Sequence, residues 1–213
     1  MLAGGLGERF GGNKALAALD GKTMLRHILD RIISVAEEKA IVIRDSYKLA
    51  DYQPHVPKAV RILKDSQPSR GPLVGIVTGL SHLSSTYVCV LSCDLPLVNP
   101  NAIKHLFEVV QRRDAAVPVC PNGRIEALHA VYRRRTALKA CGDALIAGEL
   151  SNKDMIKRLK LVAYVPVADF KRYDPKLLTF RNVNTHRDLT DARSILGSME
   201  KAKGTMLGEP RFI

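Results

Sequence analysis

The pattern of apolar residues along the chain predicts helices and strands in alternation. Apolar residues recur at helical spacing from Met24 to Ile33, which indicates an amphipathic helix packed on a sheet. Nearly continuous apolar runs, typical of buried parallel strands, occupy 40–43, 60–63, 87–91, 115–120 and 162–167. Further helices are expected over 73–83, 101–113, 136–147, 152–159 and 189–196. This alternation predicts an α/β fold, a three-layer α/β/α sandwich around a mainly parallel, Rossmann-like sheet.

Length and composition are those of a single globular domain. The chain has 213 residues, of which 46% are hydrophobic and 25% charged. We expect one domain over 1–199 and a mobile tail over 200–213, where glycine and proline interrupt a weak periodicity. No apolar run approaches the ~20 residues of a membrane span, and the first residues do not have a signal-peptide pattern. The four cysteines form no C-x-x-C pair. A cytoplasmic protein with reduced thiols is expected.

The formal net charge of +12 would attract phosphates of any kind. The basic residues, however, are scattered in short groups, and aromatic residues make up only 5% of the chain, with no Trp. A stacking platform for single strands is therefore not indicated. We favour a solvated basic surface over specific nucleic-acid binding.

The first fourteen residues contain five glycines and end at Lys14. Glycine allows the backbone to approach a ligand closely, and successive N–H groups can then form a nest for phosphate oxygens. Arg9 and Lys14 add positive charge at the same place. We predict a triphosphate cradle between a strand and a helix that begins near Thr23. The alternative is a flexible, glycine-rich chain end.

Two familiar phosphate-binding motifs are absent from this region. A Walker A loop ending at Gly21-Lys22-Thr23 would need glycine where Leu16 stands. A Rossmann fingerprint starting at Gly5-Leu6-Gly7 would need glycine where Phe10 stands. The cradle, if present, is of another type.

The stretch does match the nucleotidyltransferase signature L-A-G-G-x-x-x-R-x-G-x-x-K, through Leu2–Gly5, Arg9, Gly11 and Lys14. The chain resembles the molybdenum cofactor guanylyltransferases, which join GMP from GTP to molybdopterin. Sugar-nucleotide and cytidylyl transferases share this opening, but E-A-L-H-A-V-Y-R at 126–133 and F-R-N-V-N-T at 180–185 resemble the molybdopterin branch. The resemblance covers about 1–198 and implies the nucleotide-diphospho-sugar transferase fold.

Asp94 follows the strand expected over 87–91, in the D-x-P context where the family places its metal-binding acid. A carboxylate at that position can hold Mg²⁺, which keeps waters and bridges substrate phosphates. A helix-capping aspartate is the alternative, but Asn99-Pro100 already provides a cap and a first turn. We expect Asp94 to be the metal ligand.

The resemblance also implies the other residues of the nucleotide site. Asp65, followed by G-P-L-V-G at 71–75, fits the place of the family's nucleoside-contacting acid, although alone it would be read as a turn residue. The implied catalytic residues are Arg9, Lys14 and Asp94, and the implied nucleotide contacts are Leu2, Ala3, Gly4, Gly5, Lys14, Asp65 and Asp94.

Three residues are expected on the acceptor side. A lone histidine in a strand is more often a core residue than a catalyst, so His129 is given only a substrate-binding role. Asn182 and Asn184 would face the same way in an extended segment, and a structural pair of turn asparagines is the alternative. Thr185 and Asp188 resemble a capping box.

The expected activity is transfer of GMP from GTP to molybdopterin with Mg²⁺, with transient contact to cofactor-synthesis enzymes or acceptor molybdoenzymes. The alternatives are transfer of CMP to molybdopterin, transfer of a nucleotide to a sugar phosphate or lipid precursor, and a non-catalytic cofactor-binding adaptor. In the family a longer buried strand leads into L-A-G-G, whereas only Met1-Leu2-Ala3 is available here. We therefore expect the natural polypeptide to start upstream of Met1.

Overall fold

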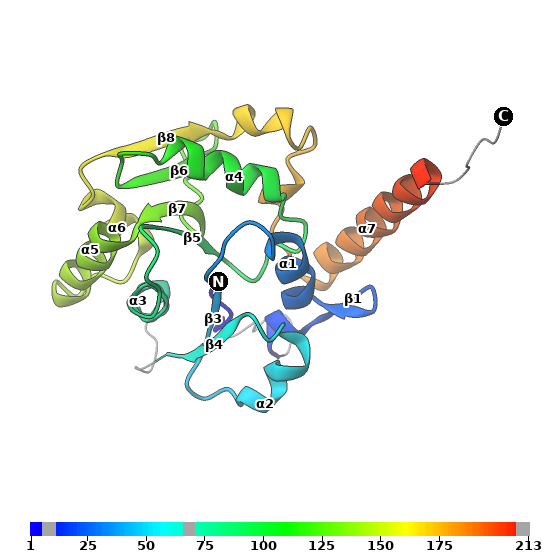
Figure 1. The fold of residues 1–213 in the computed structure, drawn as a ribbon, viewed down its shortest axis with the longest axis horizontal. Helices are drawn as coiled ribbons and strands as arrows, with labels where there is room; N and C mark the ends of the chain where they lie inside the picture. Colours follow the sequence, from blue (N-terminus) through cyan, green and yellow to red (C-terminus); the bar gives the residue numbers. More distant parts are fainter. Residues whose placement is uncertain (6–11, 66–70, 208–213) are drawn as a thin grey trace.

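The computed structural model describes residues 1–5, 12–65 and 71–207, and it has a β-sheet with helices on both faces (Figure 1). One part of the sheet pairs β3 (Ala40–Ile43) in parallel with β4 (Arg61–Lys64). The other part has the order β5-β7-β6-β8, with the bounds Tyr87–Leu91, His129–Arg133, Ala115–Val119 and Val162–Pro166. The predicted α/β fold with a mainly parallel sheet is confirmed.

Strand β7 is the exception, since it runs antiparallel to both β5 and β6. The connection from β6 reverses at Asn122-Gly123, where Gly123 has φ +79° and its N–H donates to the Cys120 carbonyl over 2.9 Å. An antiparallel bridge joins Val119 to Ile125 just before and after this turn. A connection of this kind returns the chain beside the strand that it leaves, so β7 must run against β6.

Helices α1 (Met24–Ile32) and α4 (Pro100–Val109) cover one face of the sheet, and three helices cover the other. These three are α3, α5 and α6, with the bounds Pro72–Ser81, Arg134–Ile146 and Asn152–Lys157. The predicted caps of α4 and α6 are confirmed, because the side chains of Asn99 and Ser151 accept from backbone N–H groups of the first turn.

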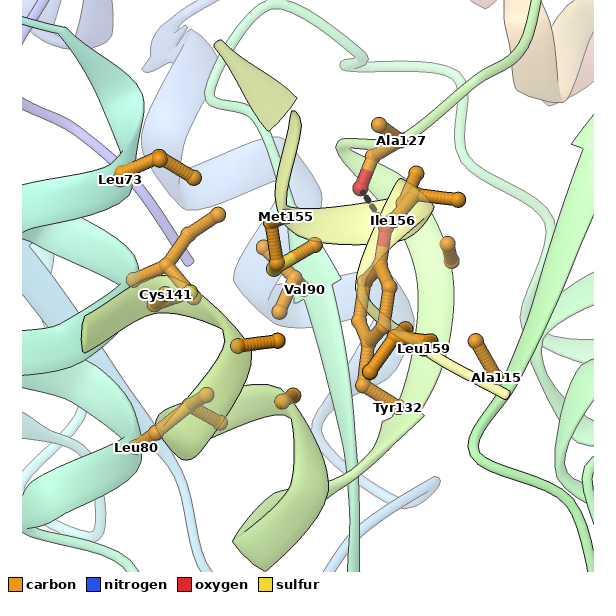
Figure 2. Packing of buried hydrophobic residues seen from close by; sticks show 14 of the residues in the cluster. Leu73, Leu80, Val90, Ala115, Ala127, Tyr132, Cys141, Met155, Ile156 and Leu159 are labelled. Atoms are coloured by element: carbon orange, nitrogen blue, oxygen red, sulfur yellow. Dashed lines mark hydrogen bonds between the residues drawn. The ribbon is translucent and has the colours of Figure 1, made fainter. Parts of the chain in front are cut away.

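The alternation of side chains along the strands sorts the core into two layers. Ala115 and Val117 of β6 pack with α3, α5 and α6, whereas Ala116 between them packs with α4. Figure 2 shows the first of these layers, in which the fully buried Tyr132 donates its hydroxyl to the Ala127 carbonyl over 2.8 Å. This bond satisfies the one polar atom that the ring carries into the apolar layer.

The N-terminal residues join the two parts of the sheet at one point. Leu2 forms parallel bridges with Val42 of β3 and with Ser92, which directly follows β5. The Leu2 N–H donates to the Leu91 carbonyl over 2.8 Å. Farther from this point, β3 and β5 face each other across an apolar cavity of about 100 Å³. The bridges therefore fix the carboxyl ends of β3 and β5 side by side, where open α/β sheets bind ligands.

The chain between the glycine-rich segment and α1 differs from the prediction. A 3₁₀ turn, η2 (Lys14–Leu16), and a hairpin of β1 (Ala18–Leu19) and β2 (Lys22–Thr23) precede the helix. Asp20 and Gly21 connect the two strands with φ of 47° and 73°. Positive φ at both positions defines a tight hairpin turn, for which Asp-Gly is a favoured sequence. The helix does begin after Thr23, whose hydroxyl accepts from the Arg26 N–H.

The last helix is longer than predicted. Helix α7 (His186–Leu207) continues beyond 200, where the sequence analysis expects a tail, and extends away from the rest of the molecule in Figure 1. Most residues at 200–207 are good helix formers, and one glycine does not interrupt the helix. The domain bounds and the mobility of 208–213 stay predictions. The remaining short helices are α2 (Leu49–Tyr52), η3 (Gln53–His55), η4 (Val167–Arg172) and η5 (Leu178–Phe180).

Two further features are the state of the cysteines and the apolar character of the helices. All four cysteines are free, and burial raises the pKa of Cys93 and of Cys141 to about 12, so these thiols stay protonated. Among the described residues, none of the helices is long and apolar enough to cross a membrane.

Candidate active site

Three residues from distant parts of the chain meet at the carboxyl end of β5. The Lys14 ammonium donates to the Asn184 amide oxygen over 2.7 Å and forms an ion pair with the Asp94 carboxylate at 3.2 Å. The Lys14 and Asp94 side chains are only 12% and 18% exposed. A largely desolvated charge pair of this kind interacts more strongly than a surface pair, because less water screens it.

Backbone hydrogen bonds hold each member of this group in place. The Cys93 N–H donates to the Leu2 carbonyl, and the Val183 N–H donates to the Asp94 carbonyl over 2.8 Å. Lys14 opens η2, whose cap is the Asn13 side chain. The N-terminal segment, the end of β5 and the 182–184 segment are thus fastened to one another around Lys14 and Asp94.

The predicted capping box that follows Asn184 is confirmed. The Asp188 carboxylate accepts from the N–H groups of Asn184 and Thr185 at 2.9 and 2.8 Å, and the Thr185 hydroxyl accepts from the Asp188 N–H. These backbone donors hold the pKa of Asp188 below its ordinary value. The cap fixes the chain just beyond Asn184, so it helps to position that amide beside Lys14.

The backbone of Ala3-Gly4-Gly5 is held through its carbonyl groups. The hydroxyls of Tyr52 and Tyr47 donate to the Ala3 and Gly5 carbonyls at 3.1 and 3.2 Å, and Arg44 Nε donates to the Gly4 carbonyl at 3.2 Å. Within the described part of the chain, no acceptor is found for the Gly4 and Gly5 N–H groups. These two N–H groups are therefore available for anion binding.

Close backbone packing explains the residue type at Gly4. A Cβ atom at Gly4 would lie 3.2 Å from the backbone nitrogen of Arg44, so a side chain would push the two segments apart. Arg44 and Tyr52 were not among the predicted site residues. The position of Arg44 directly after β3 was the available signal. Arg9 lies outside the described residues, so its predicted role stays a prediction.

A pocket of about 540 Å³ opens beside Asp94. Asp94 and Asn182 line one part of it, and Asn152 and Lys153 at the start of α6 line another. The Asn152 amide oxygen is buried and has no hydrogen-bond partner among the described residues. Pro72, Ser92 and Glu126 also contribute to the wall. The residues from α6 were not predicted, because nothing in their spacing links them to the D-x-P segment.

The two asparagines do not share a face as predicted. The segment 181–184 is irregular, so the two-residue alternation of a strand does not apply. Asn184 binds Lys14, whereas Asn182 lines the pocket. Asn182 and Asn184 flank Val183, whose backbone N–H donates to the Asp94 carbonyl.

Asp65 lies apart from this group. It follows β4, is 6% exposed, and accepts a hydrogen bond from the Thr78 hydroxyl of α3 over 2.9 Å. Its backbone N–H donates to the Ile43 carbonyl at the end of β3. The structure therefore places Asp65 under α3 and not in the pocket beside Asp94. Its role as a nucleoside contact stays a prediction.

His129 is a core residue in this structure. It is 1% exposed, its Nε2 lies 3.5 Å from the Thr179 hydroxyl, and its ring centroid lies 4.8 Å from that of Phe180. Burial lowers the pKa of His129 to about 3, so the ring is neutral at physiological pH. His129 does not line the pocket, and the geometry gives no support to direct substrate contact.

We expect acid to destabilise the protein through His129. The unfolded chain takes up a proton near pH 6.5, whereas the folded chain takes it up only near pH 3, so the free energy of unfolding falls as the pH falls between these values. Between pH 7 and 5 the loss from this group is about 2 kcal/mol. Urea unfolding of the parent protein and of His129→Leu at both pH values measures the difference. An equal loss in both proteins would contradict the assignment.

The Asp94 carboxylate could hold a divalent metal ion. Among the described residues, no three His, Cys, Asp or Glu side chains cluster as a protein cage of the zinc type requires. Mg²⁺ instead prefers one or two carboxylates, waters and substrate phosphates. The carboxylate of Asp94 is a donor of that kind at the edge of the pocket.

Comparisons with known proteins show which family the chain is similar to. Residues 1–162 match the model of the MobA-like NTP transferase domain. A protein named "Probable molybdenum cofactor guanylyltransferase" from Methanosarcina acetivorans is 35% identical, with 93% of this chain and 89% of that protein covered. A molybdenum cofactor guanylyltransferase from Desulfosudis oleivorans is 32% identical, with 92% of this chain and 94% of that protein covered.

The fold is similar to that of solved structures. Molybdopterin-guanine dinucleotide biosynthesis protein A from Archaeoglobus fulgidus is similar with a TM-score of 0.77 and 28% identity, covering 92% of this chain and 97% of that one. A cytidylyltransferase from Thermus thermophilus shares the fold with a TM-score of 0.67 at 18% identity, covering 91% of this chain and 96% of that one. The chain belongs to the MobA-like NTP transferase family, among the molybdenum cofactor guanylyltransferases.

Proposed function

We propose that the protein transfers GMP from GTP to molybdopterin, giving the guanine dinucleotide form of the cofactor and pyrophosphate. The observation that supports this most is the meeting of Lys14, Asp94 and Asn184. There the Lys14 ammonium, a cation suited to phosphates, lies within hydrogen-bonding distance of both a carboxylate suited to a metal and an amide. Family membership and the names of the relatives make molybdopterin the acceptor that we favour.

The triphosphate would lie along the glycine segment. The N–H groups of Gly4 and Gly5 would donate to phosphate oxygens, and Lys14 would exchange Asp94 for a phosphate. In the free protein the ion pair keeps both side chains in place while their net charge is zero. Binding of the nucleotide therefore uses groups that are already oriented. Arg9 is expected to add a second positive charge.

Asp94 would hold Mg²⁺ together with waters and phosphate oxygens. The ion, when bound, supplies charge neutralisation at the α-phosphate. Lys14 would then neutralise the charge of the pyrophosphate that departs. No side chain is needed as a nucleophile, because the terminal phosphate of the acceptor is already an anion.

The acceptor would enter the pocket that Asp94 shares with Asn182 and Lys153. Lys153 brings a positive charge for its phosphate, and the amides of Asn152 and Asn182 offer hydrogen bonds to polar atoms of a pterin. An acceptor phosphate oxygen would attack the α-phosphorus of GTP in line, forming one P–O bond while the bond to pyrophosphate breaks. The protein contributes mainly position and charge.

Pyrophosphate release from each of the four NTPs, with Mg²⁺ and molybdopterin present, tests this function. We expect release with GTP, and only when the acceptor is added. Release with CTP in preference to GTP would assign the protein to CMP transfer. Release with a sugar phosphate but not with molybdopterin would assign another acceptor. A protein that binds nucleotide and acceptor with no release would be an adaptor.

We expect replacement of the two asparagines to separate the two substrates. Asn182→Ala should raise the KM for molybdopterin about tenfold and leave GTP affinity unchanged, since Asn182 lines only the pocket. Asn184→Ala, the matched variant two residues away, should weaken GTP binding, because it removes an acceptor that orients Lys14. Calorimetry with GTP and initial rates at varied molybdopterin measure both. A GTP defect in Asn182→Ala would place the acceptor elsewhere.

A further inference from the structure

A second pocket lies at the opposite end of β5 from Asp94. Its volume is about 250 Å³, and it is lined by five residues that we call the arginine pocket: Ser84, Thr86, Arg133, Arg134 and Arg135. Tyr87, at the start of β5, is paired with Arg133, at the end of β7, whereas Leu91 at the other end precedes the active site. The length of β5, about 13 Å at 3.3 Å per residue, separates the two ends.

The three arginines of this pocket form no ion pairs among the described residues. Arg134 Nη1 donates weakly to the Leu80 carbonyl over 3.4 Å, and its Nε is buried without any hydrogen-bond acceptor among the described residues. A buried, unsatisfied charged donor is costly, so a bound acceptor at this place would stabilise the protein.

The chemistry of the pocket selects a phosphate-bearing anion. Planar guanidinium groups match the oxygens of phosphate in pairs, which ammonium groups do not. The volume of about 250 Å³ is several times the ~30 Å³ of one water molecule, which leaves room for phosphoryl groups. We propose that the arginine pocket is a second anion site that binds a small anion with one or two phosphoryl groups.

Two observations favour a small anion over a nucleic acid. The five lining residues include no aromatic side chain on which a base could stack. Glu38 lies at the edge of the pocket, where its carboxylate accepts from the Ser84 N–H at 2.9 Å and pairs with Arg61 at 3.2 Å. A long polyanion that extends from the pocket past Ser84 would run against this negative charge.

Calorimetric titration with inorganic pyrophosphate, without GTP or divalent metal, tests the proposal. We expect Arg134→Gln to weaken binding about tenfold, because a charge-assisted hydrogen bond is lost. The double variant Arg133→Gln/Arg135→Gln, which changes two exposed side chains, should do the same if Arg134→Gln fails to fold. The matched control is Arg193→Gln, an exposed arginine of α7 that removes the same charge. Pyrophosphate bound at the active site contributes equally to all four proteins.

The outcomes separate the alternatives. Weaker pyrophosphate binding in both pocket variants, with the control unchanged, supports the site. Equal binding in all proteins overturns it. Tighter binding of a ten-nucleotide single strand than of pyrophosphate, lost in the pocket variants, would also overturn it in favour of a nucleic-acid surface. Because the readout is affinity in the absence of substrates, it is independent of whether nucleotidyl transfer occurs. Turnover of Arg134→Gln should be that of the parent protein.

Discussion

Asp94→Asn should nearly abolish nucleotidyl transfer while the protein remains folded. The substitution keeps the volume of the side chain but removes the charge that would hold Mg²⁺ and that pairs with Lys14 at 3.2 Å. Loss of one preorganised electrostatic contact costs ~10²–10³ in rate, and loss of a metal site costs more. Initial rates of pyrophosphate release at saturating GTP and increasing Mg²⁺ measure the effect.

The matched control is Asp45→Asn, which removes one carboxylate 72% exposed at the surface and leaves the site intact. Circular dichroism and thermal unfolding check the fold of both variants. Parent-like turnover of Asp94→Asn at high Mg²⁺ would exclude this carboxylate as the metal ligand. Equal loss in Asp45→Asn would point to a general effect of charge.

Lys14→Ala should weaken GTP binding about tenfold to a hundredfold and leave the affinity for guanosine unchanged. The reason is that the Lys14 ammonium would bind phosphate oxygens and does not reach the base. The variant also leaves Asp94, only 18% exposed, without its cation. Calorimetric titration with GTP and with guanosine separates a phosphate effect from a base effect.

Lys22→Ala is the matched control, since Lys22 belongs to the Gly21-Lys22-Thr23 segment that only superficially resembles a Walker A loop. Its side chain is 53% exposed and pairs with Asp30 on the surface of the hairpin and α1. We expect this variant to bind GTP like the parent protein. Equal losses for GTP and guanosine in Lys14→Ala would move Lys14 out of the triphosphate site.

Local sequence patterns predicted most of the elements. The strands at 40–43 and 87–91 match β3 and β5, and the capping signals at Asn99, Ser151 and Thr185 begin α4, α6 and α7. These features depend on backbone hydrogen bonds within a few residues, so the sequence nearby contains the cause. The β1–β2 hairpin depends on an equally local signal, the Asp-Gly turn, and was not predicted.

The site was predicted only in part, because its residues come from separate parts of the chain. Sequence motifs pointed to Lys14, Asp94 and Asn184, and the fold brings the Lys14 ammonium within 3.2 Å of both the Asp94 carboxylate and the Asn184 amide oxygen. The same motifs also pointed to His129, which the fold buries between Thr179 and Phe180. A motif identifies residues that lie near a site in the sequence. Whether their side chains are buried depends on the residues that pack against them.

The sequence by itself determined the α/β class, the position of the glycine-rich segment and the candidate carboxylate, since periodicity, glycine content and residue type are local properties. Only the tertiary structure decided which residues share a pocket. The ends of β3 and β5 meet because Leu2 bridges Val42 of β3 and Ser92. Asn152 and Lys153 line the pocket because the start of α6 lies against it. The arginine pocket likewise exists because β7 runs antiparallel to β5 and returns Arg133 to the start of that strand. Such contacts join residues far apart in the chain, and only packing specifies them.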